Sequence, residues 1–335
     1  MLSKHVNIPI FIPHLGCPHH CVFCDQKKIT GQQGEVTLLQ AEEIIEKHLA
    51  TIRLPREQIE IAYFGGSFTA IPTDKQKAYL ALANRYLNDG RVGGIRISTR
   101  PDAIDHDILK RLKDYNVKTI ELGAQSMDDS VLALSGRGHT AEQTRISSRL
   151  IKEYGFDLGI QLMTGLCGDS PKQSLTSAQE IVPLEPACVR IYPTLVIKGT
   201  ILEKLYHAGS YRPDSLSTTI RLVGEMLHIF YKANIPVIRI GLASSESMTE
   251  QDDIIAGPNH PALRELCEGT AFLRVINRLL EDKPTKGKYL IIHAPATYFS
   301  RLSGHKKCNS TYLLQKFGLV NILFRPSDTV SFHLE

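Results

Sequence analysis

Three of the seven cysteines, Cys17, Cys21 and Cys24, lie within eight residues and form the pattern Cys-x3-Cys-x2-Cys. Thiolates bind soft metals, and a structural zinc site normally closes a tetrahedron of four protein ligands, often two Cys-x2-Cys pairs. A second pair is missing, because the other cysteines occur singly at 167, 188, 267 and 308. A [4Fe-4S] cluster held by three thiolates instead leaves one iron open to another ligand. The spacing therefore favours an open-site cluster with a catalytic use.

Two other uses of these thiols stay open on spacing alone. His14, His19 and His20 lie beside the cysteines, and any of them could complete a zinc site. The simpler interpretation of these histidines is that they are loop residues near a cluster. Thiol redox chemistry is the other alternative. A disulfide framework is not indicated, because the number of cysteines is odd.

The composition is that of an ordinary globular protein, with 42% hydrophobic and 22% charged residues. A length of 335 residues predicts one large domain plus a smaller one, or a single elaborated barrel. The net charge of +4 is compatible with an anionic substrate or RNA, and equally with no charged partner. The first apolar run starts at residue 6 without a secretory signal, and no apolar run approaches the roughly 20 residues of a membrane helix. We therefore expect a cytoplasmic protein without a membrane partner.

Strand-like and helical segments alternate through the first 240 residues or so. We expect strands at 6–12, 59–66, 94–101, 118–126, 156–166 and 188–196, and helices at 38–54, 74–88, 105–114, 140–154 and 174–184. This repetition predicts an α/β fold whose parallel sheet is covered by helices. Six units, fewer than eight, predict an open, partial TIM-like barrel. We also expect the strands to carry little charge, because both faces would be buried.

Active sites of such sheets lie at the carboxyl ends of the strands. The segments expected to meet there are Gly65-Gly66-Ser67, Ser98-Thr99-Arg100, Gln125-Ser126, Thr164-Gly165 and Tyr192-Pro193. Arg190, Lys198 and Arg239 would add positive charge near the same mouth if the substrate is anionic.

The sequence changes character after residue 245. The polar stretch 242–253 marks a boundary between a core over 1–245 and a small α+β domain over 246–335. In that domain we expect helices at 261–280 and 298–317 and strands at 288–294, 320–324 and 330–333. His305, Lys306 and Lys307 would lie at a loop-to-helix junction, where backbone amides and lysines could hold a phosphate. The alternative is a solvated basic helix face.

The cysteine pattern, with Phe23 just before the third cysteine, resembles the radical S-adenosylmethionine (SAM) superfamily. The resemblance implies a partial (β/α)6 barrel, a [4Fe-4S] cluster on Cys17, Cys21 and Cys24, and SAM chelated by the open iron. It also implies an external electron donor, reductive cleavage of the sulfonium, and a 5′-deoxyadenosyl radical that abstracts hydrogen from a substrate. In this chemistry the protein positions the cofactor and excludes water and oxygen.

Further motifs resemble family positions that contact SAM. Gly65, Gly66 and Ser67 in YFGGSF correspond to the glycine-rich strand end that lies against the SAM amino group, where a side chain would collide. In the segment 121–140, Gln125 is in the position of a glutamine that faces SAM. Arg137, before Gly-His, corresponds to an arginine that binds its carboxylate, which a planar guanidinium can pair bidentately.

One subgroup is closer. The motifs STRPD (98–102), ELGAQS with RGHT, and RIYPTLVIKGT (190–200) resemble the radical SAM core of the Elongator catalytic subunit over about residues 5–245. Ser98 stands where that subunit usually has Glu, and Gln161 where related members have an Asp that holds the ribose. The acetyltransferase domain and the long N-terminal tRNA-binding extension are not seen, so we expect a short, stand-alone Elongator-like protein.

Three functions follow from these expectations. The first is a radical SAM enzyme acting on an RNA base or nucleotide-like substrate, with tRNA as a partner. The second is a radical SAM enzyme acting on a small metabolite. The third is a non-catalytic binding module that carries zinc or a cluster.

Overall fold

A computed structural model describes residues 5–12, 17, 21–25, 36–242 and 253–335. The chain divides into two compact units. Unit 1 comprises Met1–Asp214 and Ala233–Pro258, and unit 2 comprises Ser215–Lys232 and Asn259–Glu335. Most of the expected boundary stretch, residues 243–252, lies outside the described residues. Helix α9 (Leu216–Lys232), expected in the core, belongs to unit 2, because it packs closely on α10 (Leu263–Leu280).

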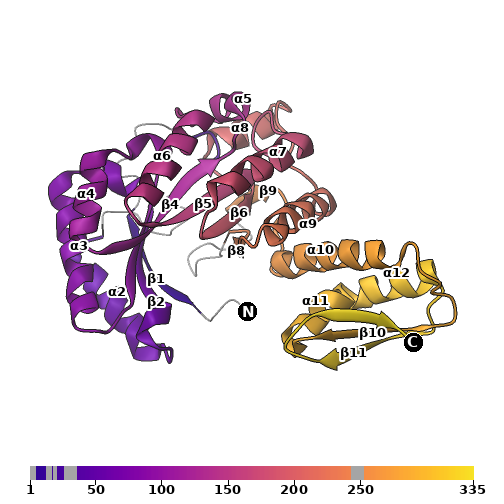
Figure 1. The fold of residues 1–335 in the computed structure, drawn as a ribbon. Helices are drawn as coiled ribbons and strands as arrows, with labels where there is room; N and C mark the ends of the chain where they lie inside the picture. Colours follow the sequence, from indigo (N-terminus) through magenta and orange to yellow (C-terminus); the bar gives the residue numbers. More distant parts are fainter. Residues whose placement is uncertain (1–4, 13–16, 18–20, 26–35, 243–252) are drawn as a thin grey trace. The chain divides into compact units, whose positions relative to one another are not determined.

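Unit 1 is built on a parallel sheet of seven strands in the described part of the chain. In spatial order these are β1 (Val6–Ile12), β2 (Ile59–Gly65), β3 (Gly94–Thr99), β4 (Val117–Gln125), β5 (Asp157–Thr164), β6 (Cys188–Pro193) and β8 (Val237–Ile240). The curled sheet leaves β1 and β8 as edges, so the predicted partial barrel is confirmed (Figure 1). The seventh strand was missed because it is only four residues long and includes a charge, Arg239.

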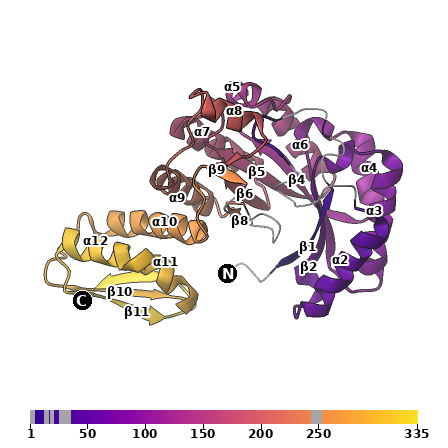
Figure 2. The same ribbon diagram turned by 180° about the vertical axis from the view of Figure 1, so that it is seen from behind.

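Helices cover the outer face of this sheet. They are α2 (Leu38–Thr51), α3 (Thr73–Asn88), α4 (His106–Asp114), α6 (Ala141–Glu153) and α7 (Pro171–Ile181), each within a few residues of its predicted range (Figures 1 and 2). The Thr37 and Thr140 side chains form capping boxes that start α2 and α6. The shorter helices α5 (Asp129–Leu134) and α8 (Ile201–His207) and the small strand pair β7 (Val196–Ile197) and β9 (Ile254–Ala256) complete the described part of unit 1.

The expectation of strands with little charge is wrong. Glu60 on β2, Arg96 on β3, Glu121 on β4 and Arg190 on β6 are all at most 8% exposed. They form one chain of ion pairs, with Arg96 bonded to Glu60 at 2.6 Å and to Glu121 at 2.7 Å, and Arg190 bonded to Glu121 at 2.8 Å. The interior of a half barrel is wide enough to bury charges, provided that they pair.

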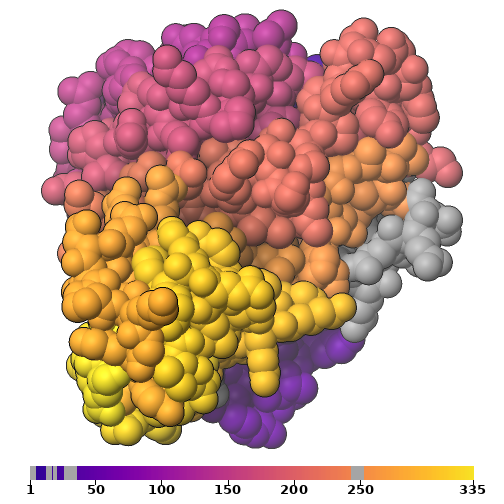
Figure 3. All heavy atoms as spheres, turned by 90° about the vertical axis from the view of Figure 1, so that its right-hand side faces the viewer, coloured from indigo at the N-terminus to yellow at the C-terminus, as the bar shows by residue number. Residues whose placement is uncertain are grey.

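Unit 2 packs its helices on a three-stranded sheet in the order β11-β10-β12. The strands are β11 (Asn321–Pro326), β10 (Tyr289–Ala294) and β12 (Ser331–Leu334), close to the predicted ranges. The expected helix over 298–317 is broken at Gly304 into α11 (Phe299–Ser303) and α12 (Cys308–Phe317). Apolar residues of α10, β10, α11, α12 and β11 form its core. Residues after 259 appear in orange and yellow in the heavy-atom view (Figure 3).

Within the described residues, no helix is long and apolar enough to cross a membrane.

Candidate functional site

The three cysteines of the opening motif lie just beyond the carboxyl end of β1, and all three are half-buried. Burial and the neighbouring thiols raise the pKa of Cys24 to about 12, and burial with the Cys21 charge raises that of Cys17. Arg137 opposes both shifts. Thiolates gathered this closely are stable only beside compensating positive charge, which a bound metal centre supplies. His14, His19 and His20 lie outside the described residues.

Phe23 anchors the cysteine loop. With Val22 it packs against an apolar cluster of Val196, Leu202 and Tyr211. The backbone is tied on both sides of this contact, because Val22 N–H donates to the Ser135 carbonyl at 3.1 Å and Leu202 N–H donates to the Val22 carbonyl at 2.8 Å. An aromatic residue before the third cysteine therefore has a packing role in this chain.

Gly65 and Ser67 hold the loop from the β2 side. Gly65 has a φ of +113°, and a Cβ there would lie 2.7 Å from the Ile12 carbonyl oxygen. Gly66 N–H donates to that same oxygen at 3.0 Å. A backbone hydrogen bond from Ser67 reaches Cys17, while the Ser67 hydroxyl bonds to Thr99 at 2.8 Å. A glycine is thus required at position 65 by the approach of two strand ends of the chain itself.

Gln125 ends β4 in a left-handed conformation with a φ of 65°. This conformation costs about 1–3 kcal/mol in a residue other than glycine and is concentrated at functional sites. The side chain is 9% exposed, and its Oε1 is buried without a hydrogen-bond partner. A buried acceptor without a partner indicates a missing donor.

Arg137 reaches from the segment after α5 to the cysteine loop. Its Nη1 donates to Cys21 Sγ at 3.4 Å and its Nη2 to the Gly123 carbonyl at 2.6 Å, while Nε is buried without a partner. A Cβ at Gly123 would lie 3.0 Å from Gln125 Nε2 and 3.4 Å from Arg137 Nη2, so both side chains pack closely over this glycine. The guanidinium therefore stands between the end of β4 and the thiols.

Two neighbours of Arg137 add to this region: Arg100, which belongs to a segment expected at the strand ends, and His139, which was not among the predicted site residues. Arg100 pairs with Asp102 at 2.9 Å and donates to the Arg137 carbonyl, and its Nη1 is buried without a partner. His139 Nε2 lies 3.2 Å from the Ala124 carbonyl oxygen, and its Nδ1 is also unpartnered. Burial, with the charges of Arg137 and Arg100, lowers the pKa of His139 to about 4, so the ring is neutral. The sequence signal for both was their place within STRP (98–101) and RGHT (137–140).

Ser98 and Gln161 lie together on the inner face of the sheet. Gln161 Nε2 donates to Ser98 Oγ at 3.2 Å and to Glu121 Oε2 at 2.8 Å. Although burial acts to raise it, the pKa of Glu121 is lowered, because Arg190 and Arg96 stabilise the carboxylate. Arg190 is therefore committed to an internal ion pair, which differs from its expected place as an open charge at the mouth.

Four buried polar atoms without partners thus lie at the ends of β3 and β4 and on the segment after α5, on Arg100, Gln125, Arg137 and His139. Of these residues, Arg137 bonds directly to Cys21. Among the described residues, no three His, Cys, Asp or Glu side chains are arranged to hold a single metal ion. Three thiolates that bind three different irons of a cube do not need to converge on one point. The three thiols with a guanidinium bonded to one of them are a donor set that fits such a cluster.

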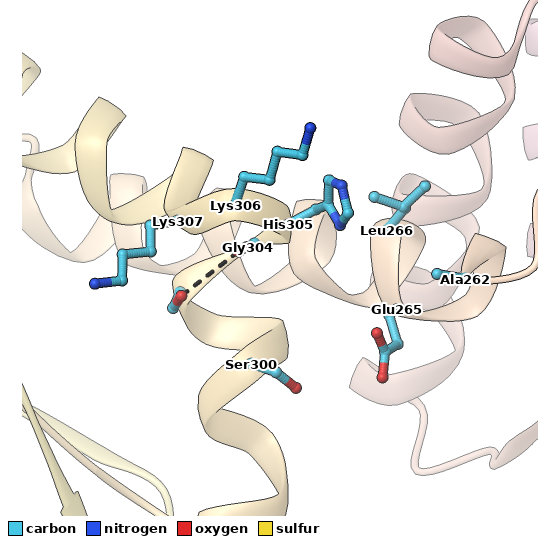
Figure 4. Close-up of a pocket in the computed structure, with 9 residues that line it drawn as sticks. Ala262, Glu265, Leu266, Ser300, Gly304, His305, Lys306 and Lys307 are labelled. Atoms are coloured by element: carbon cyan, nitrogen blue, oxygen red, sulfur yellow. Dashed lines mark hydrogen bonds between the residues drawn. The ribbon is translucent and has the colours of Figure 1, made fainter.

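The predicted loop-to-helix junction of unit 2 is present. His305–Lys307 form a short turn before α12, and they line a pocket of about 280 Å³ with Ala262, Glu265 and Leu266 among others. Lys306 and Lys307 point away from one another in this pocket (Figure 4). The two ammonium groups therefore do not form a cradle for one phosphate.

Comparison with known proteins agrees with this arrangement. Residues 11–179 match the Radical SAM superfamily, and residues 186–271 match the Radical_SAM C-terminal domain. The chain belongs to the radical SAM superfamily. It is accordingly an enzyme of the radical SAM class, whose cofactors are a [4Fe-4S] cluster and SAM.

Its similarity to individual proteins extends to Elongator-type sequences. The chain is 25% identical to a tRNA uridine(34) acetyltransferase of Dehalococcoides mccartyi, over 67% of this chain and 56% of that protein. It is 30% identical to an uncharacterized protein of Methanocaldococcus jannaschii, over 67% of this chain and 72% of that protein. A solved archaeal Elp3 from Methanocaldococcus infernus, with its N-terminus deleted, superposes with a TM-score of 0.64 at 24% identity, covering 80% of this chain and 62% of that one. The chain spans about half the length of the acetyltransferases that it matches.

Proposed function

We propose that this radical SAM enzyme modifies a nucleoside in tRNA, with Cys17, Cys21 and Cys24 as the cluster ligands. The observation that carries the site assignment is the bond from Arg137 to Cys21 Sγ at 3.4 Å, made by a guanidinium whose Nε is buried without a partner. When bound, the cluster and SAM supply reductive cleavage of the sulfonium to a radical that abstracts hydrogen. An electron-donor protein would supply the electron, and a cytoplasmic location suits that supply.

The residues of the chain have distinct parts in this proposal. Arg137 Nε and Gln125 Oε1 are both buried without a partner. In this proposal Arg137 would donate to the SAM carboxylate, and Gln125 would accept from its amino group. The backbone at Gly65, Gly66 and Ser67 would line the same group, with Phe23 holding the loop in position. Ser98 and Gln161 lie further inside the barrel, where they would contact the ribose or substrate side.

The tRNA substrate rests on the relatives. Several of the similar proteins are tRNA uridine(34) acetyltransferases or Elongator complex protein 3, including the human one at 28% identity over 51% of this chain. The similarity covers 56%, 48% and 35% of these relatives' own lengths, so it supports a related substrate more strongly than it supports their whole activity, acetyl transfer. A small-metabolite substrate remains the competing hypothesis.

Anaerobic reconstitution with iron and sulfide, followed by SAM and dithionite, tests the site. We expect 5′-deoxyadenosine from the wild-type chain and a SAM affinity lowered about tenfold in Gln125→Ala, since a hydrogen bond to a charged group is worth about 1.5–3 kcal/mol. Gln173→Ala, a glutamine bonded to Asp128 away from the thiols, is the matched control. Unchanged SAM affinity in Gln125→Ala would remove Gln125 from the site.

Nucleoside analysis of total tRNA tests the substrate. Cells that lack the protein should lose one modified nucleoside or accumulate its precursor. Expression of the wild-type gene should restore the normal nucleoside profile. The Cys24→Ala variant should fail to restore it. Identical nucleoside profiles with and without the protein would refute the tRNA substrate and favour a small metabolite, while leaving the SAM-cleavage result intact.

A further inference from the structure

Positive charge is concentrated in unit 2. This unit holds 13 of the 39 Lys and Arg residues and 7 of the 35 Asp and Glu residues, a net charge of +6. The remaining 26 cationic and 28 acidic residues give unit 1 a net charge of −2. The overall +4 therefore conceals two regions of opposite sign. A charge of this density on a unit of 95 residues indicates an anionic partner.

Part of this charge lines one groove. Helices α9 and α10 approach closely at Gly224, where a Cβ would lie 3.1 Å from Thr270 Cγ2. The groove beside this crossing has a volume of about 380 Å³, and the charged residues that line it are Arg221, Glu225, Arg274, Arg278, Glu281 and Lys316. On α9, Arg221, His228 and Lys232 share a face that extends about 16 Å, since the rise is 1.5 Å per residue.

The two acidic residues of the groove are already paired. Glu225 bonds to Arg274 at 3.0 Å, and Glu281 lies 3.9 Å from Lys316. No carboxylate among the described residues lies within ion-pair distance of Arg221 or Arg278, and both side chains are exposed. The groove therefore presents uncompensated cations to solvent.

His228 lies beside the cations of the groove, and its pKa reflects their positive charge. Its Nε2 lies 3.5 Å from Arg278 Nη1, and burial, followed by the charges of Arg278, Arg274 and Lys232, lowers its pKa. The ring is a neutral acceptor that holds one guanidinium in place without cancelling its charge.

We infer that this groove, which we call the α9–α10 groove (Arg221, Arg274, Arg278 and Lys316 with the adjacent His228 and Lys232), binds the phosphate backbone of the RNA substrate. The inference rests on the proposed tRNA substrate. A row of guanidiniums suits phosphates, because each can donate two hydrogen bonds to one phosphate. Contacts of this kind position an RNA without reading its bases, while the radical chemistry takes place in unit 1.

The test is binding of a fluorescein-labelled tRNA transcript to the full reconstituted chain at several KCl concentrations, measured by anisotropy. The double variant Arg221→Gln, Arg278→Gln should raise the Kd about tenfold and lower the slope of log K against log salt by about 2, one for each lost phosphate contact. The matched control is Lys283→Gln, Arg325→Gln, which removes two exposed cations of unit 2 elsewhere. It should change the Kd less than about twofold.

The outcomes separate this inference from the proposed function. Equal weakening by the groove and control variants would show diffuse attraction and overturn the groove, as would no weakening by either. Polyglutamate that competes as well as tRNA at equal charge would overturn RNA as the partner and indicate an acidic protein. A groove variant that binds tRNA as tightly as the wild type, while the cellular nucleoside still depends on the protein, refutes the groove alone. Tight tRNA binding with unchanged cellular nucleosides refutes the proposed substrate alone.

Discussion

In unit 1 four charged side chains of the strands, Glu60, Arg96, Glu121 and Arg190, are buried in ion pairs, whereas in unit 2 most cations are exposed. Arg96 and Glu121 satisfy one another and can offer little to a ligand. Arg221 and Arg278 have no carboxylate partner among the described residues. Buried pairs fix the geometry of a site and add little net stability, but exposed cations attract polyanions. This difference fits the two proposals made above, in which unit 1 carries out the radical chemistry and unit 2 binds the RNA backbone.

Removing a cluster thiol should give the largest effect, and it should be confined to unit 1. Cys24→Ala is expected to abolish SAM cleavage and to lower iron and sulfide content sharply, because a cluster cannot be held by two thiolates in this loop. The tRNA affinity should not change. Cys308→Ala, an exposed thiol of unit 2, is the control and should retain both. Loss of tRNA binding in Cys24→Ala would contradict the proposal that unit 2 binds tRNA independently of the cluster site in unit 1.

Breaking the buried charge chain should destabilise unit 1 strongly. Glu121→Ala leaves Arg96 and Arg190 without their shared carboxylate, and removing one partner of a buried pair costs about 3–5 kcal/mol. Urea denaturation measures the loss in free energy of unfolding. Glu142→Ala, which removes an exposed partner of Arg145, should cost at most about 1 kcal/mol. Similar losses of unfolding free energy in the two variants would mean that the buried ion pairs contribute no more to stability than an exposed pair.

The stability of unit 1 should fall in mild acid because of His139. Its folded pKa of about 4 lies below its ordinary value of 6.5, so the unfolded chain binds more protons between these values. Stability from this group is complete above pH 6.5 and is lost as the pH falls toward 4, by about 2 kcal/mol between pH 7 and pH 5. Urea denaturation at both pH values tests this. His139→Gln should lose less than the wild type on acidification, and an equal loss would assign the effect elsewhere.

The smallest effect should come from an exposed pair of unit 2. Arg274→Gln removes the partner of Glu225, and both side chains are at least 32% exposed. The free energy of unfolding should change by less than about 1 kcal/mol, and SAM cleavage should not change. A larger loss of stability would show that the surface charges of unit 2 stabilise its fold in addition to their proposed role in binding RNA.

Much of the fold could be predicted because regular elements carry periodic signals. Both ends of strand β1 (Val6–Ile12) and of helix α3 (Thr73–Asn88) were predicted to within one residue. Strand β8 was missed because a four-residue strand has no period to detect. The break at Gly304 was missed because an isolated glycine does not distinguish a tolerated helical residue from an interruption.

The site could be predicted in part. Cysteine spacing and the flanking motifs placed Arg137 and Gln125 beside the thiols, and the structure brings Arg137 to Cys21. The internal partners were beyond sequence reasoning, because pairing of Glu121 with Arg190 joins residues that are 69 positions apart. The available signal was a single charged residue inside an apolar run, as in Ile-Glu-Leu (120–122) or Val-Arg-Ile (189–191). The prediction of strands with little charge did not take these residues into account.

The bond between Val22 and Leu202 also bears on biosynthesis. The cysteine motif leaves the ribosome early, yet its anchor lies 180 residues further along the chain. The loop therefore reaches its final conformation only after translation has passed α8. Iron delivered before that moment would meet thiols that lack this anchor, so we expect cluster assembly to follow the synthesis of α8.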